Sequence, residues 1–173
     1  TYAIAAIAID NEDPGATVRI LNNTFYSNDV PDIDLGSGNF YDRIEIKNNV
    51  FVRDGTPSSN DSFFEISQSN QLAVIDSDYN CFWWPGQSSS SMTFAISGSS
   101  LSNSFDSWRA TSGQDAHSIW GNPQFVNAPA GVFSLDSSSI AVDRGEDLPT
   151  VHDDILGQFR PSGSGHDMGA FER

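Results

Sequence analysis

The chain has few cysteines and few basic residues. It contains one cysteine, Cys81, one lysine, Lys47, and 8 basic residues in total against 23 acidic ones. A single cysteine cannot form an internal disulfide, and its neighbours in "YNCFWW" include no group that would lower its pKa, so we expect a buried structural thiol. The net charge of −15 disfavours nucleic acid and anionic membranes as partners. An anionic polysaccharide would need a cation such as Ca²⁺ to screen these charges.

Long apolar runs are also lacking. No segment approaches the roughly 20 apolar residues that a membrane-spanning helix needs, so we predict no membrane span. The first ten residues, "TYAIAAIAID", lack the basic flank and cleavage region of a signal peptide. We therefore expect any signal to have been removed or to lie upstream. A length of 173 residues fits one domain with a well-buried core.

An Asn-x-Phe motif recurs along the first half of the chain. Its copies begin at Asn23, Asn49 and Asn80, at intervals of 26 and 31 residues. Other hydrophobic residues keep the same distance from each copy, which indicates a structural repeat with loops of different length. The positions so aligned are Ile7, Ile33 and Phe64, followed two residues later by Ile9, Leu35 and Ile66, and nearer the motif Val18, Ile44 and Ile75.

Apolar and polar residues alternate within each repeat, as in a strand with one buried face. Stacked strands would bring the motif asparagines into an amide ladder and the phenylalanines into an inner column, with Asn49 at a corner. The repeat therefore predicts an all-β parallel solenoid, a single-stranded β-helix of about four coils. A β-sandwich is the alternative, and the solenoid is favoured because a sandwich has no reason to repeat residue types in the same order.

The last third of the chain has a different pattern. Residues 102–114, "SNSFDSWRATSGQ", have Ser or Asn caps and end near Gly113, which predicts one short helix. Short extended pieces punctuated by Gly, Pro and Ser follow and predict an irregular cap. We expect one domain over residues 1–173, with stacked coils in 1–100 and the helix and cap in 101–173, as the C-terminal part of a longer solenoid.

Three segments of this tail resemble a known family. They are "GNPQFVN" at 121–127, "GVFSLDSSSIAVDRG" at 131–145 and "DDILGQFRPSGSGHDMGAFE" at 153–172. Their order resembles the C-terminal part of choice-of-anchor Q domain proteins in the pectate-lyase-like superfamily. The resemblance implies a right-handed parallel β-helix on a secreted or cell-surface bacterial protein that handles polysaccharide. Arg160 is the expected ion-pair partner of Asp154, Asp167 or Glu172.

The repeat predicts which outward residues become neighbours. Asp34 and Glu65 fall at equivalent positions, with Asp32 close by. Two carboxylates about 5 Å apart suit acid–base glycoside hydrolysis, and the three together suit a Ca²⁺ site. An acidic patch without a ligand is the third interpretation.

Opposite charges also fall side by side in the repeat. Arg19 is expected beside Glu45, and Lys47 beside Asp78. Lys47 is also a candidate lyase base. Lyases of the resembled superfamily pair a Lys base with an Arg acid, and the candidates for these two roles in this chain are Lys47 and Arg53. The expected ion pair with Asp78 gives Lys47 a structural role, which makes a catalytic role less favoured.

Trp83 and Trp84 lie in the aromatic run "CFWWPG" and are candidates to stack on a sugar, although one of the two is expected in the core.

Together these features predict a polysaccharide-handling protein, either part of a lyase or glycoside hydrolase or a noncatalytic carbohydrate-binding or surface module. The expected partners are polysaccharide or oligosaccharide, with self-association through an open N-terminal end of the stack.

Overall fold

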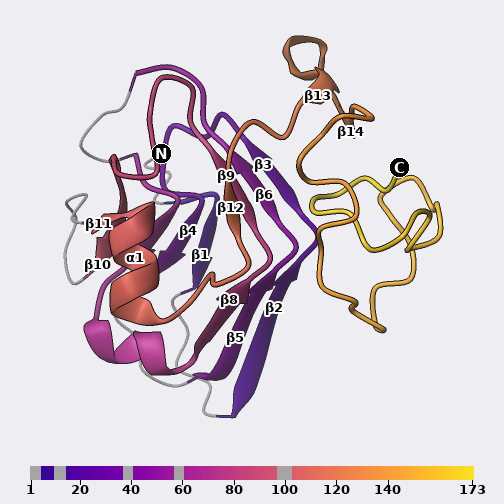
Figure 1. Ribbon diagram of the computed structural model, residues 1–173. Coiled ribbons are helices and arrows are strands. Elements are labelled where there is room, and N and C mark those ends of the chain that lie inside the picture. Colours follow the sequence, from indigo (N-terminus) through magenta and orange to yellow (C-terminus); the bar gives the residue numbers. More distant parts are fainter. Residues whose placement is uncertain (1–4, 10–14, 37–40, 57–60, 97–102) are drawn as a thin grey trace.

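The described part of the protein contains four sheets, three of which surround an apolar core, with one short helix and a long irregular tail (Figure 1). A computed structural model describes residues 5–9, 15–36, 41–56, 61–96 and 103–173. Successive described strands between Ile7 and Ile96 join these three sheets in rotation. No helix in this described part is long and apolar enough to span a membrane.

The sheets are named A to D here. Sheet A contains, in order, β1 (Ile7–Ile9), β4 (Ile33–Leu35), β7 (Phe64–Ile66), β10 (Met92–Ile96) and β11 (Asn103–Ser104). Sheet B contains β2 (Ala16–Leu21), β5 (Tyr41–Lys47) and β8 (Ile75–Asp78). Sheet C contains β12 (Ile119–Trp120), β9 (Cys81–Trp83), β6 (Val50–Val52) and β3 (Thr24–Tyr26). Sheet D is the pair β13 (Phe125–Asn127) and β14 (Val132–Leu135).

The predicted fold class, a right-handed parallel β-helix, is wrong. The strands form four separate small sheets, and no closed or solenoid sheet is seen in the described ranges. Most pairs are parallel, but β10 pairs antiparallel with β11, and β13 with β14. The physical reason is that the repeat specifies which strands are neighbours within a sheet. It does not specify how the chain leaves one sheet and enters the next.

The strand register deduced from the repeat is confirmed. Ile33 is paired with Ile7 on one side and with Phe64 on the other, and Phe64 is paired in turn with Phe94. The phenylalanine column is confirmed as well, because the ring of Phe51 stacks on Phe25 at 4.7 Å and on Phe82 at 5.0 Å between centroids. Ring stacking of this kind adds to the stabilisation that burial already provides.

The asparagine ladder runs along the corner between sheets B and C. Asn49 Oδ1 accepts a hydrogen bond from Asn23 N at 2.9 Å, and Asn80 Oδ1 accepts one from Asn49 N at 2.9 Å. The left-handed backbone falls one residue earlier than expected, at Asn48 with φ of 57° rather than at Asn49. Asparagine tolerates this conformation, but the third repeat has Tyr79 there with φ of 55°.

The predicted helix is present as α1 (Phe105–Ser112). The Ser104 side chain accepts a hydrogen bond from Ser107 N at the start, and Gly113 ends the helix with φ of 71°. Glycine suits this position because a Cβ is disfavoured at positive φ. Two short 3₁₀ helices, η1 (Ser69–Ala73) and η2 (Ala128–Ala130), complete the helical elements of the described chain.

The tail covers the outward face of sheet C. Val50, Val52 and Cys81 on that face pack with Leu135 and Met168 of the tail in a second apolar cluster. Figure 1 shows the tail on one side of the three sheets, away from α1. This arrangement leaves a groove where the tail passes the end of sheet C.

Arg160 anchors the end of the tail. Its Nη1 lies 2.7 Å from Glu172 Oε2, and both side chains are fully buried. The same Nη1 donates to the carbonyl oxygen of Asp167 at 3.1 Å. The expected ion pair of Arg160 is therefore confirmed, with Glu172 as its partner.

Candidate functional site

Asp34 and Glu65 are neighbours, as the repeat predicts. They lie opposite each other on the paired strands β4 and β7. Asp34 is buried and Glu65 is partly exposed. Burial, reinforced by the charge of Asp34, raises the pKa of Glu65 above its usual range. A carboxyl group in this environment keeps its proton to higher pH, which a general acid needs.

The carboxylate of Asp32 contacts Asn28 and Arg53. Its Oδ1 accepts a hydrogen bond from Asn28 at 2.6 Å, and its Oδ2 lies 3.5 Å from the Arg53 guanidinium. Burial is complete and raises the pKa of Asp32 to about 7, although Arg53 and Asn28 act in the opposite direction. The three carboxylates Asp32, Asp34 and Glu65 therefore do not converge.

The calcium expectation gains no support from this geometry. In the part of the chain that the structure describes, no group of three or more His, Cys, Asp or Glu side chains is arranged to hold a metal ion. Arg53 already provides a positive charge beside Asp32. A cation there would be repelled by the guanidinium at short range.

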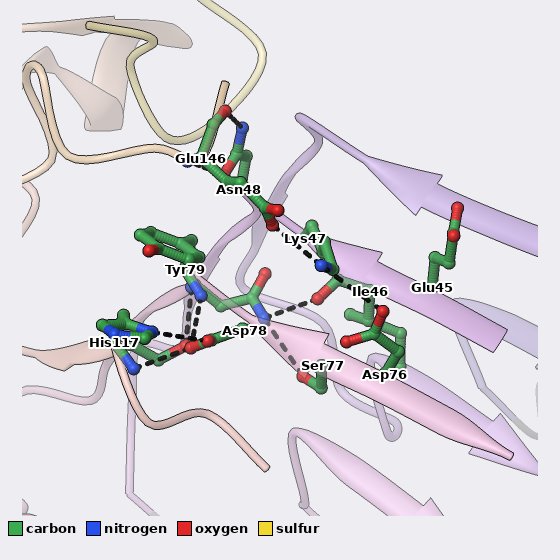
Figure 2. A network of polar contacts seen from close by, with 12 residues as sticks. Glu45, Ile46, Lys47, Asn48, Asp76, Ser77, Asp78, Tyr79, His117 and Glu146 are labelled. Carbon is green, nitrogen blue, oxygen red and sulfur yellow. Dashed lines mark hydrogen bonds and ion pairs between the residues drawn. The ribbon is translucent and has the colours of Figure 1, made fainter. Parts of the chain in front are cut away.

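Lys47 lies in a network of polar contacts on sheet B (Figure 2). Its Nζ lies 2.8 Å from Glu146 and 3.4 Å from Asp76. Burial lowers the pKa of Lys47, but Glu146 and Asp76 outweigh it and raise the pKa above the usual value. A lysine that is held protonated in this way is a poor general base, and these contacts therefore disfavour the predicted catalytic role of Lys47.

The charge pairs on sheet B are partly as predicted. Arg19 forms the expected ion pair with Glu45, at 2.6 Å. Lys47 and Asp78 do lie opposite each other in register, but Asp78 instead binds His117, whose Nδ1 is 2.7 Å from Asp78 Oδ2. Figure 2 shows the contacts of Lys47 and the contact between Asp78 and His117 in different parts of the network. Glu146 was not predicted, because it lies in the tail, outside the repeat.

The two tryptophans have different environments. Trp84 is 1% exposed, and its Nε1 donates to the carbonyl of Gly55 at 3.1 Å, so its predicted role in stacking on a sugar is wrong. Trp83 is partly exposed at the end of β9 and lines a groove. Among the described aromatic residues it stacks on none. The alternation of the strand explains the difference, since Trp83 lies on the outward face.

The groove beside Trp83 has a cavity volume of about 340 Å³. One wall comes from the ends of β3, β6 and β9, and the opposite wall comes from residues 122–129 of the tail. The lining combines aromatic, amide and carboxylate groups. These are Tyr26, Trp83 and Phe125 together with Asn122, Gln124, Asn127 and Asp54.

The groove is held in shape by contacts of its own walls. The Tyr26 ring lies 6.2 Å from Phe125 and 5.0 Å from Phe133, which joins sheet C to sheet D. Asn122 Oδ1 accepts a hydrogen bond from Gln124 N at 2.8 Å. Ser27 donates to the carboxylate of Asp54. These contacts pre-form the groove before any ligand binds, which lowers the entropic cost of binding.

Arg53 lines the same groove but is not a free cation. Its guanidinium donates to the carbonyls of Asn28 and Val30, each at 2.6 Å, and only 2% of its side chain is exposed. It also lies over the rings of Phe63 and Trp84. The charge exposed in the groove is therefore that of Asp54.

Comparison with protein-family models, with curated proteins and with solved structures finds no significant match.

Proposed function

We propose that this protein binds neutral oligosaccharides in the groove beside Trp83. The observation that carries the proposal is a partly exposed tryptophan that forms one wall of a pre-formed groove with amide and carboxylate groups around it. The C–H face of a pyranose ring packs on an aromatic ring, and its hydroxyls hydrogen-bond to amides and carboxylates. The volume is in the range of small-ligand sites.

The charge of the groove favours a neutral sugar. Asp54 is exposed there, while the Arg53 guanidinium is buried against backbone carbonyls. An anionic sugar would meet a like charge at short range. A carbohydrate-binding role on a secreted or cell-surface protein also agrees with the polysaccharide handling that the tail segments suggest by resemblance.

The test is a binding screen of neutral oligosaccharides by isothermal titration calorimetry. Trp83→Ala is expected to weaken the Kd of the best ligand at least tenfold, because the stacking wall is lost. Asn127→Ala removes an exposed amide of the groove and is expected to weaken binding several-fold with little effect on folding.

Phe159→Ala is the matched control, because Phe159 is a highly exposed aromatic residue outside the groove. It should leave the Kd unchanged. Equal affinities for wild type, Trp83→Ala and Asn127→Ala, or no binding to any oligosaccharide, would refute the proposal. Thermal melting of each variant separates lost binding from lost folding.

Acid–base glycoside hydrolysis by Asp34 and Glu65 is a second candidate. It is favoured by the raised pKa of Glu65 beside Asp34 on paired strands. The test is release of reducing ends from a polysaccharide panel, with Glu65→Gln expected to reduce the rate at least 100-fold. Asp42→Asn, an exposed carboxylate elsewhere, is the control. Retained activity in Glu65→Gln would exclude the pair.

A further inference from the structure

A second pocket lies between β12 and the segment 137–144 of the tail. Its volume is about 610 Å³. It is separate from the groove beside Trp83, because Ser138 donates to Gln124 Oε1 at 3.2 Å and Ser139 donates to the carbonyl of Pro123. The two cavities share no lining residue. The lining consists of Ile119, Trp120, Ile140 and Val142, with Ser137, Ser138, Ser139 and Arg144.

Half of the residues that line this pocket are apolar. Ile140 is 39% exposed, although a branched aliphatic side chain is usually buried. It lies close to Gly121, where an added Cβ would be 2.6 Å from Ile140 Cδ1. Glycine at this position therefore lets Ile140 approach the end of β12. The apolar side chains form a surface that a ligand can remove from water.

Two nitrogen donors of the residues that line the pocket lack partners. Arg144 is exposed and makes no ion pair or hydrogen bond to any residue that the structure describes. The Nε1–H of Trp120 is buried and has no acceptor in the same part of the chain. The Trp120 ring also packs against Phe63 and Phe105 of the core, at 5.9 Å from each between centroids.

Nearby carboxylates do not neutralise Arg144. Asp136 Oδ1 accepts a hydrogen bond from Ser138 N at 2.9 Å, and Asp143 Oδ1 accepts one from Gly165 N at 2.9 Å. Neither aspartate lines the pocket. Although the chain carries a net charge of −15, distant charges are screened over about 8 Å at physiological ionic strength. Among the residues that line the pocket, the charged one is Arg144.

We propose that this pocket binds small amphipathic carboxylates, molecules with one carboxylate group and an aromatic or branched aliphatic body. The carboxylate pairs with the guanidinium of Arg144, whose planar donors match two carboxylate oxygens. The apolar body packs against Trp120 and Ile140. This site is independent of the oligosaccharide groove, so either can be present without the other.

The test uses phenylacetate as the probe and phenylacetamide, which has the same body without the charge, as its control. Binding is followed by the ¹H–¹⁵N signal of the Trp120 indole and by calorimetry. Phenylacetate should shift that signal saturably, and phenylacetamide should bind at least tenfold more weakly. Arg144→Gln should weaken phenylacetate binding at least tenfold, while Ile140→Ser should weaken both probes.

Arg109→Gln is the matched control variant, because Arg109 is an exposed arginine on α1 outside this pocket. It should bind phenylacetate as wild type does. Equal binding of the two probes, an unchanged Kd in Arg144→Gln, or no saturable shift of the Trp120 signal would each overturn the proposal. Oligosaccharide binding by the same variants is expected to stay unchanged, which separates this result from the test of the groove.

Discussion

Asp32 carries a carboxyl group that the fold removes completely from solvent. Its Oδ2 accepts no hydrogen bond from any described residue, and the nearest charge is Arg53 at 3.5 Å. Arg53 itself divides its donors among backbone carbonyls. The ion pair is therefore too weak to offset the loss of hydration, and burial raises the pKa of Asp32 to about 7.

This environment makes the stability of the protein depend on pH. The pKa of Asp32 is about 7 in the folded state and near 4 in the unfolded chain. Between pH 4 and pH 7, Asp32 is therefore protonated in the folded state and ionised in the unfolded state. The stability that Asp32 contributes is complete below pH 4 and is lost as pH rises through 7, on the order of 4 kcal/mol. Urea unfolding from pH 4 to pH 8 should show this decrease for wild type.

Asp32→Asn resembles the protonated acid but cannot ionise. The part of the decrease in unfolding free energy with rising pH that comes from Asp32 should therefore be absent in this variant. Compared with wild type it should be relatively more stable at pH 8 than at pH 4. Asp29→Asn, an exposed aspartate three residues earlier, is the control and should follow the wild-type curve. A difference between Asp32→Asn and wild type that is the same at pH 4 and pH 8 would contradict the assigned pKa.

At the scale of elements, the asparagine ladder joins the repeats at one corner. Asn49 is fully buried and makes bonds on both sides. Its Oδ1 accepts from the backbone N and the Nδ2 of Asn23, while its Nδ2 donates to the Ile20 carbonyl at 2.8 Å and to Asn80 at 3.1 Å. Ser118 ends the ladder, since its Oγ accepts from Asn80 N at 2.7 Å.

Asn49→Ala should therefore destabilise the protein by about 3 kcal/mol, because buried partners lose their hydrogen bonds on both sides. Asn23→Ala should cost about 1 kcal/mol, because among the described residues Asn23 has a ladder neighbour on one side only. Urea unfolding measures both. Equal losses for the two variants would show that the ladder does not act as described.

The repeat explains which of these features can be predicted from sequence. It gives the strand register, the neighbours Asp34 and Glu65 and the stacked phenylalanines, because equivalent positions in successive repeats lie side by side in a sheet. It fails on the fold class, since spacing carries no information on how separate sheets join. It also cannot give the contact of Lys47 with Glu146, because no repeated position relates the tail to sheet B.

The groove shows the same limit. The outward position of Trp83 follows from strand alternation, but the opposite wall comes from residues 122–129. Their approach depends on the aromatic contact between Tyr26 and Phe125. Tail segments with irregular backbone have no periodicity from which such a contact could be deduced.

At the scale of the whole molecule, the tail and the sheets depend on each other. Asn48 exchanges two hydrogen bonds with the backbone of Glu146, and Gly169 N donates to the carbonyl of Asn48 at 2.6 Å. The tail in turn covers Cys81, whose thiol is fully buried, and burial raises its pKa. Reactivity of this thiol therefore reports whether the tail stays in place.

Glu172→Gln tests this dependence, because it leaves the buried guanidinium of Arg160 without its ion-pair partner. We expect a loss of about 3 kcal/mol in urea unfolding and faster reaction of Cys81 with a thiol reagent under native conditions, as the tail opens locally. Glu45→Gln removes the partner of the exposed Arg19 and should cost less than about 1 kcal/mol without changing the thiol reaction. A faster thiol reaction in both variants would mean that Cys81 becomes accessible by global unfolding. An unchanged reaction in Glu172→Gln would mean that the Arg160 ion pair does not hold the tail on sheet C.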